Sequence, residues 1–373
     1  MSKKITNEKE LKKSYEEIWG KYDLTEERSY YGWILNLLKV NRGQKLLDVA
    51  CGGGYLLNAA IQKDMTSYGI DISQNAISKA KKLNNHPEFI LASSESIPFD
   101  NECFDYITCL GSLEHFLNPE KSLYEMGRVL KDSGKICIVL PNIWSIPDVL
   151  RGWFKGDGLS HGQENERFYS LNEAKALIDE NSIFKIDKIE KYNQSPETIK
   201  IAKPLPKFNN IYITLYKLFL NKIPVSASYV FVFICTKRFL DAPSKIEMGN
   251  ESDERFLPTG WYHTENWPPY IRWTRERAFA FLKIDKISSK LFIKAKTNYP
   301  GINVRISINR QFEERISFDD AEWKIIDVNI KDVDTNIIEV MIDVDKTWIP
   351  DELLKNGDTR ELGIAVEKIW IEQ

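Results

Sequence analysis

Short apolar runs alternate with amphipathic segments over the first 140 residues, and this alternation predicts a sheet flanked by helices. The apolar runs predict strands near residues 45–49, 66–70, 88–92, 104–110 and 134–140. Strands separated by helices form βαβ units, which build a mostly parallel sheet with right-handed crossovers. Two helices are expected before the first strand, over residues 8–40, because apolar residues recur there at helical spacing.

The pattern loosens after Pro141. Ser170 followed by Glu173 predicts a capped helix start, and residues 184–189 and 229–237 predict a last, antiparallel pair of strands. Between them, residues 196–224 have the character of an insertion. Its aromatic, lysine-flanked helix over 207–222 is compatible with packing on the sheet, with a lid over a pocket, or with peripheral contact with a membrane surface.

Beyond about residue 256 the apolar period changes to two. Six segments alternate at regular spacing, which predicts an antiparallel β-sandwich: Phe279–Ile284, Leu291–Thr297, Val304–Asn309, Trp323–Ile330, Ile337–Val344 and Leu362–Ile371. The polar stretch 241–255 precedes this change. We therefore expect an α/β domain over residues 1–240 and a β-sandwich over 256–373.

A glycine-rich turn follows the first predicted strand, where Asp48 is succeeded by three contiguous glycines, Gly52–Gly54. Glycine has no Cβ, so the main chain here can approach a nucleotide closely at the carboxyl end of a parallel strand. Asp71 ends the next predicted strand and suits the hydroxyl groups of a ribose. The two features predict a nucleotide-containing cofactor.

The turn resembles motif I of the class I S-adenosylmethionine-dependent methyltransferases more than the G-x-G-x-x-G turn of dinucleotide-binding proteins. The resemblance covers roughly residues 10–240 and continues in the right order through 93–99, 104–110, 113–116 and 129–135. It implies a Rossmann-like, seven-stranded sheet and S-adenosylmethionine as cofactor. The cofactor-binding positions that it implies are Asp48, Ala50, Cys51, Gly52, Gly54, Asp71, Ile72, Ser93, Ser94, Glu95 and Leu110.

Two of these positions depart from the family pattern. Ala50 stands where glycine is common, and an alanine is tolerable there if its φ is negative. Ser93 stands where aspartate is common, so its hydroxyl would offer the adenine amino group a neutral hydrogen bond in place of a charge-assisted one. The leading helices lie over the cofactor in this family, so Tyr15 or Tyr22 either covers the methionine end or packs within a helix face.

Methyl transfer is an in-line displacement, for which a protein mainly positions the acceptor and excludes water. An oxygen acceptor benefits from a base, and His115, just after the fourth strand, is the first candidate, with Glu114 to orient it. His115 could instead only bond backbone at a helix start. His161 is the second candidate. Similar quinone O-methyltransferases have an acidic metal ligand where Gly111 stands, so we expect no metal.

The composition and motifs of the chain limit the classes of partner and the compartment that we expect for the protein. The net charge of −3 gives no basic face for nucleic acid, and residues 110–113 lack the N/D-P-P-Y/F motif of many amino-group methyltransferases. The five cysteines fall mostly in predicted core strands without a C-x-x-C pair, which favours a reducing compartment. Met1–Lys13 has no apolar leader segment, and the longest apolar run, Tyr229–Cys235, is too short to cross a bilayer. We expect a cytoplasmic protein with a small-molecule or glycan acceptor.

Three functional hypotheses remain. Residues 260–262, 272–274 and 358–363 resemble a β-sandwich module attached to enzymes of surface-polysaccharide pathways, which favours O-methylation of a sugar in a surface glycan or in its lipid-linked or nucleotide precursor. The second hypothesis is methylation of another small metabolite, with the sandwich serving oligomerisation. The third is a glycan-binding scaffold whose nucleotide fold is inactive. Tryptophans of the sandwich either stack on sugar rings or fill its core.

Overall fold

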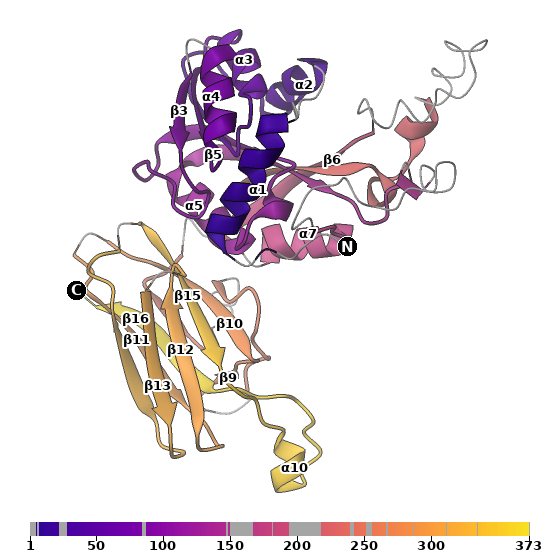
Figure 1. Ribbon diagram of the computed structural model, residues 1–373. Helices are drawn as coiled ribbons and strands as arrows, with labels where there is room; N and C mark the ends of the chain where they lie inside the picture. The colour runs from indigo at the N-terminus through magenta and orange to yellow at the C-terminus, as the bar shows by residue number, and fades with distance from the viewer. Residues whose placement is uncertain are drawn as a thin grey trace. The chain divides into compact units, whose positions relative to one another are not determined.

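The structure, a computed structural model, divides the chain into two compact units, Met1–Lys237 and Arg238–Gln373 (Figure 1). It describes residues 5, 7–21, 28–83, 87–146, 148–149, 167–180, 182–193, 218–238, 242–250, 256–265, 268–285, 287–310, 312–333 and 335–372.

The first unit is built on one mixed sheet of seven strands in the order β3-β2-β1-β4-β5-β7-β6. The strands are β1 (Lys45–Val49), β2 (Thr66–Asp71), β3 (Glu88–Leu91), β4 (Phe104–Leu110), β5 (Leu130–Pro141), β6 (Phe184–Tyr192) and β7 (Val230–Lys237). The first five are parallel, whereas β7 runs antiparallel to β5 and β6 antiparallel to β7. The order reverses between β1 and β4, which places a crevice at the carboxyl ends of these two strands.

Helices cover the sheet and confirm the predicted α/β arrangement (Figure 1). They are α1 (Glu8–Lys21), α2 (Arg28–Leu38), α3 (Tyr55–Ile61), α4 (Gln74–Leu83), α5 (Pro119–Val129) and α7 (Leu171–Lys175), with short turns η1 (Leu113–His115), η2 (Ala176–Glu180) and η3 (Val225–Ala227). Ser170 and Glu173 form the predicted capping box, in which each side chain bonds the other residue's backbone N–H.

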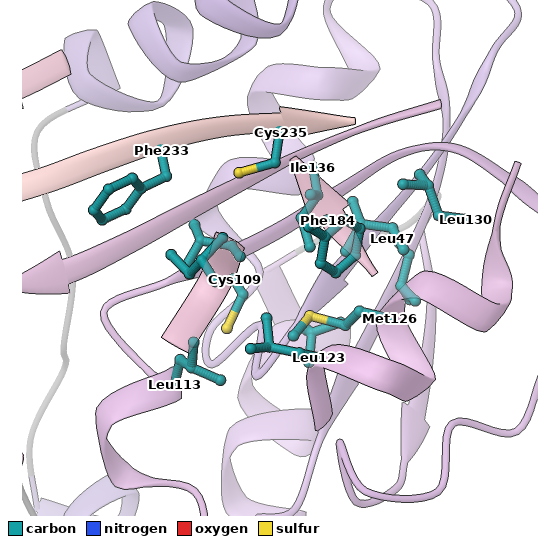
Figure 2. Packing of buried hydrophobic residues seen from close by; sticks show 14 of the residues in the cluster. Leu47, Cys109, Leu113, Leu123, Met126, Leu130, Ile136, Phe184, Phe233 and Cys235 are labelled. Carbon is teal, nitrogen blue, oxygen red and sulfur yellow. The ribbon is translucent and has the colours of Figure 1, made fainter. Parts of the chain in front are cut away.

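Alternate residues of each central strand face opposite layers, as a strand buried on both faces requires. Leu47 belongs to the core beneath α5, while Leu46 belongs to the core beneath α2 and α3. Figure 2 shows the first of these cores, in which Phe184 and Phe233 from the antiparallel pair belong to the same cluster as Leu123 and Met126 of α5. Gly127 permits this approach, because a Cβ there would lie 2.2 Å from Cδ1 of Ile183.

Helix α5 passes directly into β5 without a left-handed residue between them. The helix ends at Val129, and Leu130 is already extended, with φ −76° and ψ 136°. The strand takes up the extra residues as an irregularity against β4 between Phe104 and Tyr106, so no positive φ is needed at Gly134. Most of the predicted insertion lies outside the described residues. Residues 218–222 are helical, with Leu218 53% and Phe219 48% exposed.

The second unit contains two antiparallel sheets. One has four strands in the order β10-β15-β12-β13. The other has five strands: four in the order β14-β11-β16-β8, and β9, which pairs with β16. The elements are β8 (Lys245–Glu247), β9 (Arg272–Trp273), β10 (Arg277–Lys283), β11 (Lys290–Lys296), β12 (Ile302–Ile308), β13 (Phe312–Phe318), β14 (Lys324–Asn329), β15 (Ile337–Val344), α10 (Pro350–Leu354) and β16 (Ala365–Glu372). All six predicted strands are present within a few residues. The short edge strand β8 lies inside the stretch expected to be a linker.

No helix in the part of the chain that the structure describes is long and apolar enough to cross a membrane.

Candidate functional site

A cavity of about 560 Å³ opens at the carboxyl ends of the central strands of the first unit. Its wall includes the ends of β1, β2, β4 and β5 and the start of β7, which the sheet order brings to one edge. All the predicted cofactor-binding residues except Gly54 line this cavity. Gly54 has φ 72° and precedes the first residue of α3, so its contribution is to the start of that helix.

The turn after β1 holds a left-handed residue that the sequence analysis did not expect. Ala50 has φ 58°, so the condition of a negative φ is not met, and Gly52 has φ 52°. The main chain must reverse directly after β1 so that the Cys51 N–H can donate to the Ile70 carbonyl and the Gly52 N–H can reach Asp71. A non-glycine residue in this conformation costs about 1–2 kcal/mol, which is the cost of having alanine where the family commonly has glycine.

Asp71 lies at the end of β2 and joins the two halves of the site. Its Oδ2 accepts from the Gly52 N–H and its Oδ1 from the Ser73 N–H, both at 2.9 Å. The side chain is buried, and this burial raises its pKa to about 6. An ionised carboxylate has about four lone-pair sites, so the carboxylate keeps accepting capacity for a hydroxyl donor of a ribose.

Asp48 is the second buried carboxyl of the cavity. The Thr108 hydroxyl donates to its Oδ1 at 2.6 Å, and burial raises its pKa to about 7. Neither carboxyl has a cationic partner among the residues that the structure describes, and two such buried groups favour a ligand that brings positive charge and hydroxyl donors. S-adenosylmethionine carries both, through its sulfonium and ammonium groups and its ribose, so the residues present fit this cofactor.

The loop after β3 supplies the other side of the cavity through Ser93, Ser94 and Glu95. Ser93 Oγ accepts from the Glu95 N–H at 3.3 Å, and Ser94 Oγ lies 3.0 Å from Oγ of Ser122. Glu95 Oε1 accepts from the Asn118 N–H at 2.9 Å. These bonds tie the loop to the start of α5 and fix its position beside the cavity.

The candidate base and its neighbour occupy the short turn after β4. His115 and Glu114 are both buried and line the cavity, with 3.8 Å between Nε2 and Oε1. That separation is too long for a hydrogen bond but leaves the two side chains close enough to interact electrostatically. The Tyr15 ring meets the imidazole edge to face, with centroids 6.0 Å apart. His161 lies outside the described residues.

Arg167 is a residue of the site that sequence reasoning missed. Its guanidinium donates to the carbonyl oxygens of Glu114, Phe116 and Leu117, at 3.3, 2.5 and 3.3 Å. It therefore holds the turn that carries His115. No motif marks this arginine, because it bonds backbone about 50 residues earlier in the chain.

Helix α1 covers the cavity with one face. Leu11, Tyr15 and Trp19 line it at helical spacing, and the Trp19 ring packs so closely on the glycine turn that a Cβ at Gly52 would lie 2.4 Å from Cζ2. Glu16, on the neighbouring face, accepts from Ser73 Oγ and from the Gln74 and Asn75 N–H groups at 3.1, 2.6 and 2.9 Å. A carboxylate at a helix start is favourable, so this contact fastens α1 to α4. Tyr22 lies outside the described residues.

Among the residues that the structure describes, no three His, Cys, Asp or Glu side chains are grouped so that they could hold a metal ion.

The sequence matches the family described as "Methyltransferase domain" over residues 47–138. Uncharacterized protein MJ1252 from Methanocaldococcus jannaschii is 32% identical over 156 residues, which is 39% of this chain and 59% of that protein. A ubiquinone biosynthesis O-methyltransferase from Azoarcus sp. is 32% identical over 99 residues, 25% and 42% of the two chains. A demethylmenaquinone methyltransferase from Oceanobacillus iheyensis is 28% identical over 154 residues, 37% and 65%. The chain thus matches less than two thirds of the length of each of these relatives.

Solved structures similar to the chain include an S-adenosylmethionine-dependent methyltransferase from Aquifex aeolicus, with 15% identity and a TM-score of 0.39, covering 56% of this chain and 89% of that one. Another is the geranyl diphosphate C-methyltransferase from Streptomyces coelicolor, with 14% identity and a TM-score of 0.40, covering 56% and 77%. The family match falls on the strands and turns that form the cavity. The chain therefore contains a class I methyltransferase domain of Rossmann-like fold, with S-adenosylmethionine as its cofactor.

Proposed function

We propose that the protein transfers the methyl group of S-adenosylmethionine to a hydroxyl oxygen of a sugar, in a surface glycan or in a precursor of one. The observation that carries the transferase assignment is the single cavity in which the buried carboxyls Asp48 and Asp71 and the His115–Glu114 pair meet. Cofactor binding and proton removal can then occur side by side, at an edge of the sheet where such folds bind ligands.

S-adenosylmethionine, when bound, supplies an electrophilic methyl group. Asp71 would bind the ribose hydroxyls, and Asp48 would contribute a negative charge that suits the cationic cofactor. The imidazole of His115 accepts the proton of the acceptor hydroxyl, and Glu114 Oε1 lies 3.8 Å from its Nε2. The carboxylate then stabilises the imidazolium that forms. Tyr15 and Trp19 of α1 exclude water from the cavity.

The second unit supports a glycan acceptor. We propose that its two antiparallel sheets pack as a β-sandwich that recruits the glycan and takes no part in the chemistry. Trp273 and Trp348 are buried and fill its core. Phe292 and Trp370, by contrast, are partly exposed neighbours on β11 and β16, stacked with centroids 5.3 Å apart and planes at 17°. Such a pair offers a flat apolar surface to a sugar ring.

A small aromatic metabolite is the second candidate acceptor, since two of the relatives are named as methyltransferases of ubiquinone biosynthesis and of demethylmenaquinone. In that case the second unit would serve only assembly of an oligomer. A glycan-binding scaffold with an inactive methyltransferase fold is the third candidate.

A transfer assay separates these candidates. The full chain is incubated with methyl-labelled cofactor and a panel of short glycans, lipid-linked sugars, nucleotide sugars and quinone-type phenols. Label in a sugar supports the first candidate, and label only in phenols replaces it by the second. If the chain binds S-adenosylhomocysteine but methylates no panel member, the acceptor belongs to neither class. If the folded chain does not bind S-adenosylhomocysteine, the result favours the glycan-binding scaffold.

We also propose a cytoplasmic location without a nucleic-acid partner. Four of the five cysteines are buried free thiols, in keeping with a reducing compartment. Peripheral membrane contact through residues 207–222 is supported by the exposed Leu218 and Phe219.

A further inference from the structure

The cavity extends well beyond the residues assigned to the cofactor. Asp71 ends β2 and Tyr192 ends β6, and both line the same cavity. In the sheet order these strands are five neighbours apart, so the cavity spans about 24 Å of the sheet edge at about 4.8 Å per strand. The part from β5 to β6 contains none of the predicted cofactor-binding residues and is therefore available to a second ligand.

Tyrosine rings line the cavity from Tyr192, at the end of β6, to Tyr55, which follows the glycine turn at the start of α3. We call Tyr30, Tyr31, Tyr55 and Tyr192 the aromatic lobe; all four line the cavity and come from α2, α3 and β6. The rings of Tyr30 and Tyr192 have centroids 4.6 Å apart, and those of Tyr31 and Tyr55 lie nearly parallel, at 16° and 6.4 Å. Rings held against one another in this way present fixed faces on which another ring can stack.

The charge of the cavity is of one sign. The described lining residues include no lysine or arginine. They include five carboxyl residues, Glu8, Asp48, Asp71, Glu95 and Glu114. These groups suit a cationic cofactor. A phosphate that entered the same space would be desolvated close to like charges, and the described lining residues offer it no lysine or arginine to pair with.

From these observations we infer that the acceptor enters as an uncharged, hydroxylated ring that stacks on the aromatic lobe, and that any phosphate of a carrier stays outside the cavity. The inference rests on the proposed transferase function and narrows its acceptor. A sugar within a glycan or glycoside meets the requirement, and so does a phenol. A nucleotide sugar does not, because its phosphate is attached to the ring itself.

The test is a calorimetric titration of the full chain saturated with S-adenosylhomocysteine. The neutral probes are methyl glucopyranoside and catechol, and their charged counterparts are glucose 1-phosphate and phenyl phosphate. At least one neutral probe should bind at least about tenfold more tightly than its phosphate counterpart, and which one binds distinguishes a sugar from a phenol. Equal or tighter binding of the phosphates overturns the inference, and so does failure of both neutral probes.

Two variants locate the binding. Tyr192→Leu removes one ring of the aromatic lobe and should weaken the neutral probe at least about tenfold while S-adenosylhomocysteine binds as before. Tyr270→Leu makes the same change at an exposed tyrosine of the other unit and should alter neither affinity. Undiminished probe binding in Tyr192→Leu refutes the lobe as the subsite. If Tyr192→Leu does not fold, Tyr31→Leu takes its place with the same expectation. If the folded wild-type chain does not bind S-adenosylhomocysteine, the transferase function itself is refuted.

Discussion

The packing of Trp19 on Gly52 predicts that alanine at position 52 destabilises the protein more than alanine at position 43. Both glycines have positive φ, 52° and 77°, so either alanine costs about 1–2 kcal/mol in the folded backbone, offset by about 0.4–1 kcal/mol through the unfolded chain. A Cβ at Gly43 meets nothing within 4 Å, whereas one at Gly52 lies 2.4 and 2.6 Å from two atoms of the indole ring. Displacing that ring adds about 1–3 kcal/mol.

We therefore expect a loss of about 1 kcal/mol for Gly43→Ala and about 2–4 kcal/mol for Gly52→Ala in the free energy of unfolding. Urea denaturation followed by far-ultraviolet circular dichroism measures both. The matched control is the Trp19→Ala background, in which the steric part disappears and the two substitutions should cost about the same. If Gly52→Ala costs no more than Gly43→Ala in the wild-type background, Trp19 does not rest on the glycine turn and α1 does not cover the cavity in this way.

Three further predictions concern the cavity and its unit. His115→Ala should lower methyl transfer by at least about 100-fold and leave cofactor affinity nearly unchanged; turnover within about threefold of wild type would exclude His115 as the base. Burial raises the pKa of Asp48 to about 7 and of Asp71 to about 6. The folded protein therefore holds more protons than the unfolded chain from about pH 4 to 7. Its stability without ligand should fall as the pH rises through that window. Affinity for the cationic cofactor should rise over the upper part of the same window, and a pH-independent dissociation constant would contradict this. A fragment of residues 1–237 should still bind S-adenosylmethionine, and a folded fragment that does not would show that the second unit contributes to the site.

The sequence predicted best those elements whose signal is local. Buried strands such as β4 and β15 are nearly continuous apolar runs or strict alternations, and their bounds agree closely with the prediction. The strands that were missed are short or highly charged. β13 carries Glu313, Glu314 and Arg315 at an edge of its sheet, where charged side chains are normal because one side of the strand has no partner.

The residues that line the cavity around the glycine turn were likewise predictable, because they follow strand ends in a fixed order along the chain. The aromatic lobe was not, since its rings come from α2, α3 and β6 and meet only in the folded sheet. Arg167 gave no signal because it bonds backbone carbonyls, which any sequence supplies. The positive φ of Ala50 was missed because alanine itself disfavours it; the need for it arises from the bonds that bring Gly52 to Asp71.

The cofactor site is tested most directly by isothermal titration of the full chain with S-adenosylmethionine, in the wild type and in Asp71→Ala. Charge-assisted bonds from ribose hydroxyls to Asp71 are worth roughly 1.5–3 kcal/mol each. We expect one molecule to bind per wild-type chain and the affinity of a folded Asp71→Ala variant to be at least about tenfold lower. Unchanged affinity in that variant would remove Asp71 from the site, and a folded wild-type chain that binds no S-adenosylmethionine would contradict the assignment of the cavity altogether.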